Sequence, residues 1–169
     1  MLGKENKNMN ILSKLFDNKT KKSVALKVRG IMLGQKGDFK KAIEALKESI
    51  CLEPDSLDAY IPLAMAYRGN GMLDEAIDAL NHLIIKRNSK EIHDMMDFDI
   101  NFTFATIYMR KGDKAKIIEY AKMAIEAEEN PETKKRIEEA IQFGVITREE
   151  IDHSKMIDSL KIIIKEYEE

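Results

Sequence analysis

The chain has 169 residues, enough for one domain or one short repeat array but too few for a second catalytic domain. Hydrophobic residues make up 44% and charged residues 34% of it, with only 8 Gly and 3 Pro, which argues against β-sandwiches and barrels. The net charge of -2 is too small to steer the whole molecule toward nucleic acid, and the single cysteine excludes an intramolecular disulfide and a multi-cysteine zinc site.

The N-terminal segment, residues 1–20, has the pattern of a short amphipathic helix followed by a polar linker over residues 17–20. The apolar residues that carry this pattern are Met9, Ile11, Leu12, Leu15 and Phe16. We expect the segment to cap the fold that follows or to extend freely from it. Residues 1–10 lack the apolar stretch of a secretory signal, and no run of about 18 apolar residues occurs, so we expect a cytoplasmic protein without membrane contact.

The first 41 residues are basic. They hold 11 Lys or Arg against three acids, a net charge of +8, so the remainder must carry -10 to give the total of -2. The basic residues are densest at Lys19, Lys21, Lys22, Lys27 and Arg29. A solvated helical face explains this cluster best, because no aromatic residue is interleaved there for base stacking, while docking to an acidic partner or nucleic acid stays open.

A ten-residue segment recurs along the chain. Residues 37–46 (GDFKKAIEAL) return after an offset of 34 as residues 71–80 (GMLDEAIDAL), and a weaker third copy, residues 112–121, follows after a further 41. Seven residues before each turn glycine stands a small residue, and three places later a large one. The small residues are Gly30, Ala64 and Ala105, and the large ones are Leu33, Tyr67 and Tyr108.

This pattern predicts a helix, a turn at glycine and an antiparallel second helix in each copy. Small residues let the two helix axes approach closely, and large residues fill the space between neighbouring pairs. One pair cannot bury its apolar face alone, so the copies must stack. Replacing Ala76 by Leu should therefore overpack the second copy.

With these residues, the sequence resembles the tetratricopeptide repeat family, whose pattern is a small residue, an aromatic, Gly, Ala and a closing Pro. The resemblance covers residues 21–131, with copies at about 22–54, 55–90 and 98–131, and Pro54 stands where the first copy closes. Ile117 and Leu83 depart from the family pattern, because each stands where the pattern has a small residue. The resemblance implies an all-α fold, a right-handed α-α superhelix of antiparallel helix pairs.

The C-terminal segment, residues 132–169, reads as a further helix pair broken at Gly144. Its second helix should begin after Thr147, whose spacing to Glu150 is that of a capping box. One face of this helix is apolar: Met156, Ile157, Leu160, Ile163, Ile164 and Tyr167. The pair is either a cap on the array or a degenerate fourth repeat.

Residues suited to catalysis or metal binding are few, and we expect neither an enzyme nor a cofactor. Cys51 falls on the apolar side of a repeat helix, where a thiol behaves as a small hydrophobe. The best metal candidate is the cluster of His93, Asp94, Asp97 and Asp99. It lacks the spacing of a zinc or calcium loop, and Asp97 suits a helix cap, so we expect no metal site.

The family resemblance implies a binding surface, because the first helix of each pair lines a concave groove that holds a peptide or a helix. The lining positions, counted from the small residues, are Lys27, Ile31 and Gln35; Ile61, Met65 and Arg68; and Phe102, Thr106, Met109 and Arg110. An apolar floor with a basic rim suits an amphipathic ligand that carries acidic residues. Other methionines, including Met32 and Met123, are expected in the core. The chain's own ends could instead cover the groove.

We therefore interpret the chain as a non-enzymatic scaffold or adaptor that binds another protein in this groove. Two alternatives stay open. The chain could self-associate as a homo-oligomeric structural protein through its terminal helices, residues 9–16 or 156–167. It could also assist nucleic-acid binding through its basic N-terminal region, although we expect no nucleic-acid partner.

Overall fold

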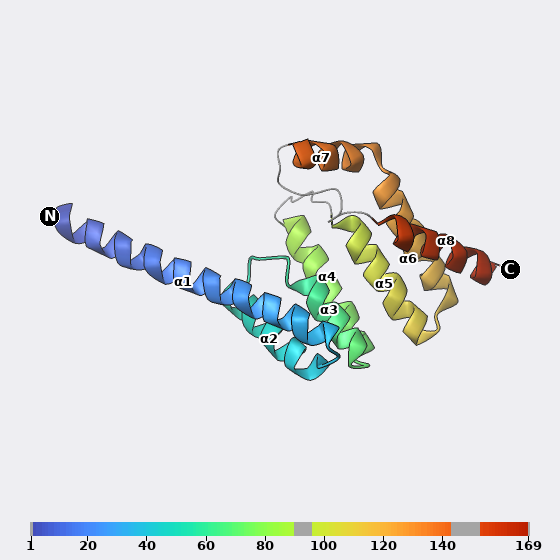
Figure 1. Cartoon of the computed structure of the whole chain (residues 1–169), viewed down its shortest axis with the longest axis horizontal. Helices are drawn as coiled ribbons and strands as arrows, with labels where there is room; N and C mark the ends of the chain where they lie inside the picture. The colour runs from blue at the N-terminus through green and yellow to red at the C-terminus, as the bar shows by residue number, and fades with distance from the viewer. Residues whose placement is uncertain (1, 90–95, 143–152, 169) are drawn as a thin grey trace. The chain divides into compact units, whose positions relative to one another are not determined.

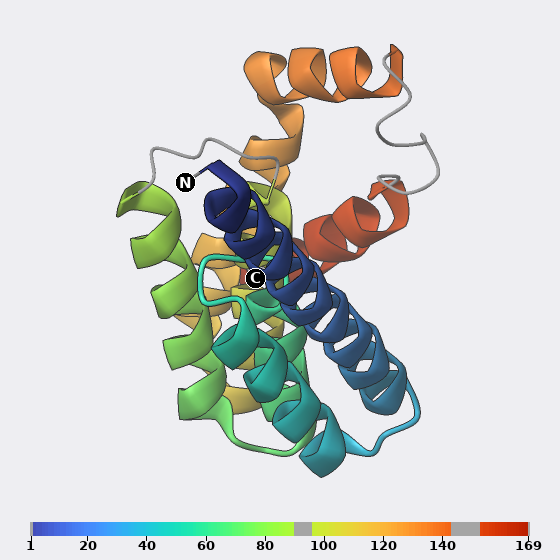
Figure 2. The ribbon, with the colours of Figure 1, turned by 90° about the vertical axis from the view of Figure 1, so that its left-hand side faces the viewer.

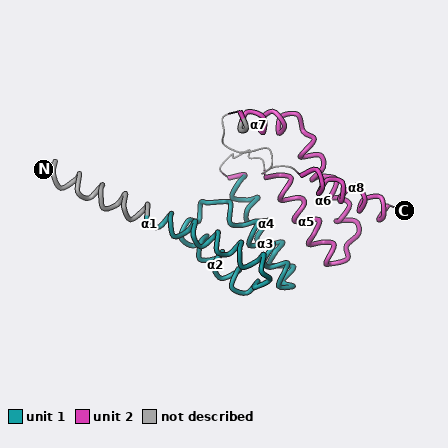
Figure 3. Tube along the Cα trace, viewed as in Figure 1, with its two compact units in different colours: residues 1–87 teal, residues 88–169 magenta. Residues whose placement is uncertain are grey.

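The computed structural model describes the backbone of residues 2–89, 96–142 and 153–168, and side chains from residue 18 onward within these ranges, apart from residues 136, 140 and 141. These residues form helices joined by turns, without a strand, so the all-α prediction is confirmed (Figure 1). The helices are α1 (Leu2–Gln35), α2 (Phe39–Leu52), α3 (Tyr60–Gly69), α4 (Leu73–Ser89), α5 (Asp97–Lys111), α6 (Lys114–Glu129), α7 (Pro131–Gln142) and α8 (Ser154–Glu168). They divide into two compact units, unit 1 (Met1–Arg87) and unit 2 (Asn88–Glu169), shown in Figure 3.

The N-terminal helix differs from the sequence-based expectation. Helix α1 runs without interruption through residues 17–20, where the sequence suggested a linker between two helices. These four residues are Asp, Asn, Lys and Thr, with neither Gly nor Pro among them. Because nothing in them breaks a helix, one long helix forms in place of a short helix and a linker.

The three predicted turns are confirmed at their glycines. Gly37, Gly71 and Gly112 have φ of 81°, 82° and 73°, a left-handed conformation that only glycine adopts without a steric cost. The preceding helix ends in the same way at each of them: the amide of the residue after the glycine donates a hydrogen bond to the carbonyl five residues before it. The bonds run from the amide of Asp38 to Leu33 O (2.9 Å), of Met72 to Tyr67 O (2.9 Å) and of Asp113 to Tyr108 O (3.2 Å). The sequence repeat therefore corresponds to a structural repeat.

In unit 1, α1 and α2 pack side by side as an antiparallel pair (Figure 2). A Cβ atom added to Gly30 would lie 2.5 Å from Leu46 Cγ, so glycine is required for this close approach. Ser23 and Ser49 are buried at the same contact, and each hydroxyl donates to the other residue's carbonyl, at 3.0 and 2.9 Å. The buried apolar residues of unit 1 include Ala42, Leu46, Ala64, Ala76, Leu80 and Leu83.

In unit 2, α5 and α6 form the third helix pair, and α8 packs against α6. The core joins Ala105 of α5, Ala121 and Ala124 of α6, and Leu160 of α8. Ile117 is fully buried, although the family places a small residue there. Three helices thus share one core.

The ends of α7 and α8 follow local signals. Helix α7 begins at Pro131, and the side-chain oxygen of Asn130 accepts from the amides of Glu132 (2.9 Å) and Thr133 (3.2 Å), which caps the helix. Helix α8 begins at Ser154, and the predicted capping box at Thr147 lies outside the described residues.

Candidate functional site

The lining residues predicted on the first helices of unit 1 lie on α1 and α3. We call Lys27, Ile31, Ile61, Met65 and Arg68 the first-helix face of unit 1. Ile31 and Met65 are apolar and exposed, at 36% and 46%, whereas Ile61 and Arg68 are half-buried. Gln35, at the end of α1, is exposed. The face therefore presents one accessible apolar side chain from each of its two helices.

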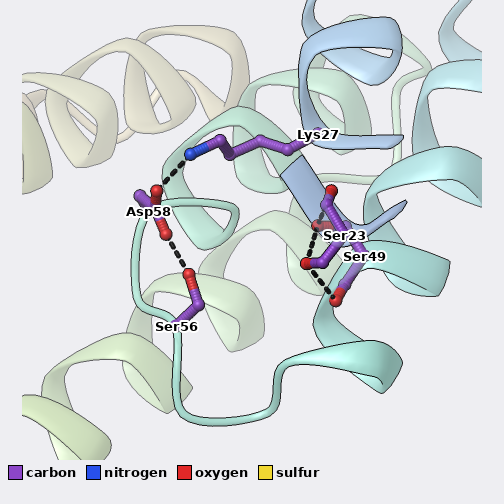
Figure 4. A network of polar contacts seen from close by, with 5 residues as sticks. All are labelled: Ser23, Lys27, Ser49, Ser56 and Asp58. Atoms are coloured by element: carbon purple, nitrogen blue, oxygen red, sulfur yellow. Dashed lines mark hydrogen bonds and ion pairs between the residues drawn. The ribbon is translucent and has the colours of Figure 1, made fainter. Parts of the chain in front are cut away.

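Lys27 is less available to a ligand than the sequence suggested. Its ammonium group forms an ion pair with Asp58 in the turn before α3, and the second oxygen of Asp58 accepts from the hydroxyl of Ser56 (Figure 4). Burial alone would raise the pKa of the Asp58 carboxyl, but the bonds from Lys27 and Ser56 outweigh burial and hold this pKa below its usual value. Lys27 thus ties α1 to the start of α3, and its charge is already compensated.

An exposed apolar stripe on α1 extends the first-helix face. It consists of Val24, Val28, Ile31 and Met32, which share one side of the helix and are 36% to 51% exposed. Placing Met32 in the core was wrong, as was placing Met123, which is 43% exposed. Helical spacing shows that Val24, Val28 and Met32 share a face, but it does not show whether another helix covers that face.

The lining residues predicted in unit 2 have mixed surroundings. Phe102 is half-buried, with its ring 5.7 Å from that of Phe98, and it packs against the core that contains Leu160. The hydroxyl of Thr106 donates to Thr103 O at 2.8 Å. Met109 and Arg110 are exposed near the end of α5. Phe102 therefore contributes to the unit's own core, and Met109 is the accessible apolar position.

His153 joins the start of α8 to both helices of the third pair. Its ring stacks on Phe98 at 4.0 Å between centroids, its Nδ1 lies 3.1 Å from Glu128 Oε2, and its Nε2 lies 3.8 Å from Asp99 Oδ1. Burial, with the neighbouring charge of Glu128, raises the pKa of Asp99, while His153 opposes this rise. These contacts position α8, and no sequence spacing indicates them, because Asp99, Glu128 and His153 come from α5, from α6 and from the residue before α8.

The residues considered for chemistry are scattered. His93 and Asp94 lie outside the described residues. Asp97 is not a helix cap, because α5 begins at Asp97 itself and Met96 occupies the cap position. Among the described residues, no group of three or more His, Cys, Asp or Glu could hold a metal ion. Cys51 was expected to be buried, but it is exposed near the end of α2.

No helix in the described part of the chain is both long and apolar enough to cross a bilayer.

The comparisons with known proteins agree with the helix pairs. The model of a tetratricopeptide repeat family matches residues 35–97, which include the turns at Gly37 and Gly71. Residues 35–97 are therefore similar to tetratricopeptide repeats. A similar fold occurs in the crystal structure of the type III secretion translocator chaperone SycD of Yersinia enterocolitica, an alternative dimer. The TM-score is 0.57 with 17% sequence identity, over 84% of this chain and 93% of that one. No curated protein matches the sequence.

Proposed function

We propose that this tetratricopeptide-repeat protein is a non-enzymatic scaffold that binds a peptide or helix of another protein on the first-helix face of unit 1. The observation that carries the proposal is the exposed apolar surface of Ile31 and Met65, continued along α1 by Val24, Val28 and Met32. Exposed apolar patches on soluble proteins commonly mark interaction sites. The similar fold of SycD, described as a translocator chaperone, is consistent with a partner-binding role.

The ligand should be amphipathic and acidic. Its apolar side chains would cover Ile31 and Met65, and its carboxylates would meet Arg68, the basic residue of the same face on α3. Lys27 does not take part directly, because it is paired with Asp58. In unit 2, Met109 is the anchor we propose, with Arg110 favouring an acidic flank as the sequence pattern suggested.

The first-helix face can be tested by placing a charge in its centre. Met65→Asp in the full chain should reduce capture of the protein's partner from a native lysate at least tenfold, because a carboxylate would be desolvated against an apolar ligand and repelled by its acids. The partner is identified by mass spectrometry with the unaltered chain, and its affinity for each variant is then measured by titration of the purified pair.

Ile85→Asp is the matched control. Ile85 is 64% exposed on α4, so it receives the same charge on the same unit but outside the first-helix face. Partner affinity should stay within twofold in this variant. Equal losses in both variants, or an unchanged affinity after Met65→Asp, would contradict the proposed location.

Self-association is a second candidate, and the outer part of the α1 stripe favours it. Val28 and Met32 are 48% and 51% exposed and lie on the side of α1 away from Lys27, whose partner Asp58 leads into α3. A second copy could cover them together with the part of the α1 stripe that continues the first-helix face. The SycD structure is itself described as a dimer.

The oligomeric state distinguishes this candidate. If α1 mediates self-association, light scattering coupled to size-exclusion chromatography should give twice the mass of 19.4 kDa, and Val28→Asp should return the mass to that of one chain. A single-chain mass at concentrations up to about 100 μM would exclude a dimer with a Kd in the micromolar range.

The structure gives less support to a nucleic-acid role than the basic charge of residues 1–41 suggests. Lys22 and Lys27, two of the five residues in the densest basic cluster, are ion-paired with Glu48 and Asp58. A phosphate backbone would have to compete with these carboxylates for the same ammonium groups. Their charge is therefore better explained by contacts within unit 1.

A further inference from the structure

Unit 1 contains a pocket that the first-helix face does not use. It lies where α2, α3 and α4 meet and has a volume of about 420 Å³, within the range of pockets that hold small ligands or side chains. Its interior is apolar, with Tyr60, Leu63 and Ala79 buried and Ile50 and Tyr67 half-buried. An apolar side chain of a ligand could therefore pack against a preformed apolar floor.

The rim of the pocket is charged. Lys47 and Cys51 contribute to it from α2, and Glu75, Asp78 and His82 from α4, and all five are exposed. Within the described residues, neither Glu75 nor Asp78 forms an ion pair or a hydrogen bond through its side chain. Other carboxylates of this unit do, as in the pairs Lys22–Glu48, Lys41–Asp38 and Lys27–Asp58. The α4 side of the rim therefore carries two negative charges that no cationic side chain among the described residues pairs with.

The pocket and the first-helix face use different sides of α3. Tyr60, Leu63 and Tyr67 recur at intervals of three and four residues and line the pocket. Met65 lies on another side of the same helix and is exposed. A ligand in the pocket therefore would not need to displace a ligand from the first-helix face.

We infer that this pocket is a second docking site, which takes a basic peptide segment of a partner protein. An apolar side chain of the segment occupies the floor between Tyr60 and Leu63, and a neighbouring Lys or Arg meets Glu75 and Asp78. The charge of the rim determines that the ligand is basic, because the rim has two carboxylates, those of Glu75 and Asp78, and one ammonium group, that of Lys47. The site thus selects the opposite charge from the ligand proposed for the first-helix face.

The two tyrosines suit the same ligand. Aromatic rings attract cations through their negative faces, and a guanidinium group can also stack on them. Burial, reinforced by the charge of Asp55, raises the pKa of Tyr60, so its phenol stays neutral and does not add a charge to the floor. The apolar interior is therefore retained at neutral pH.

Cys51 makes the inference directly testable, because it is the only cysteine of the chain and lies on the rim. The experiment measures the rate at which N-ethylmaleimide, a neutral reagent, alkylates Cys51 in the full chain. The acetylated and amidated peptide Leu-Arg-Leu-Arg should slow alkylation at least threefold with a saturable dose response. The peptide Leu-Glu-Leu-Glu, equal in length and apolar content, should leave the rate unchanged.

Variants of the rim separate specific docking from general shielding of the thiol. In the double variant Glu75→Gln, Asp78→Asn, the basic peptide should no longer protect Cys51, as judged by the ratio of rates with and without peptide. The matched control is Glu44→Gln, Asp74→Asn, which removes two carboxylates from the same helices outside the pocket lining and should keep the protection. Circular dichroism establishes that each variant is folded.

Three results would overturn the inference: no protection by the basic peptide, equal protection by both peptides, or protection that persists in the rim variant. None of these results tests the first-helix face. That face is tested by measuring the affinity of a different ligand after Met65→Asp. The two proposals can therefore fail separately.

Discussion

Replacing Leu160 by Ala should lower the free energy of unfolding by about 2 to 5 kcal/mol, because it removes a large side chain from a core with little room to collapse. Leu160 is 1% exposed and packs against Ala105, Ala121 and Ala124. These three partners are already small, so their side chains cannot extend to fill the cavity. Denaturant titration measures the loss, and hydrogen exchange of the α6 and α8 amides locates it.

Ile162→Ala is the control on the same helix. Ile162 is 59% exposed, so its truncation should change stability by no more than about 0.5 kcal/mol. Similar losses in the two variants would show that α8 does not hold Leu160 in the core of unit 2. The result matters for function, because Phe102 packs against the same core. If α8 detaches, the half-buried Phe102 should become more accessible.

Ala76→Leu should cost about 1 to 3 kcal/mol for the opposite reason, which is overpacking. Ala76 is fully buried in α4, directly after the turn at Gly71. The added carbons would have to displace neighbouring side chains that are themselves buried. A denaturant titration that shows no change would mean that Ala76 does not face another helix.

The third repeat makes this prediction informative. Ile117 occupies the position that corresponds to Ala76 and is also fully buried. A branched side chain at this position is therefore compatible with the helix pair, but only where the surrounding residues leave room for it. Ala115→Leu, an equivalent enlargement at an exposed position in α6, should stay within about 0.5 kcal/mol of the unaltered chain.

The two proposed docking sites share one scaffold and differ in ligand charge. The first-helix face offers Ile31 and Met65 beside Arg68, and the pocket offers an apolar floor beside Glu75 and Asp78. Their side chains leave α3 on different sides, so both can be occupied at once. A scaffold of this kind would bring an acidic and a basic segment close together, whether they belong to one partner or to two.

The surface of the first-helix face shows the limit of reasoning from repeats. Lys27 stands at a position where the family pattern places a ligand contact, yet in this chain it binds Asp58. Asp58 lies 31 residues away in sequence, and nothing in the spacing indicates that the two approach. Cys51 and His82 likewise line one pocket although they belong to different repeats. Contacts between repeats depend on how neighbouring helices stack, which local periodicity does not encode.

By itself, the sequence determined the helix pairs and their turns. Gly37, Gly71 and Gly112 adopt a conformation open mainly to glycine, and small residues such as Gly30 mark where two helices touch, so both features can be recognised residue by residue. Only the tertiary structure decided which apolar faces are covered: Met32 and Met123 stay exposed, while Leu160 of α8 is buried where α8 packs against α6. The physical reason is that amphipathic spacing defines a face of a helix, whereas burial of that face requires a second surface that comes from elsewhere in the chain.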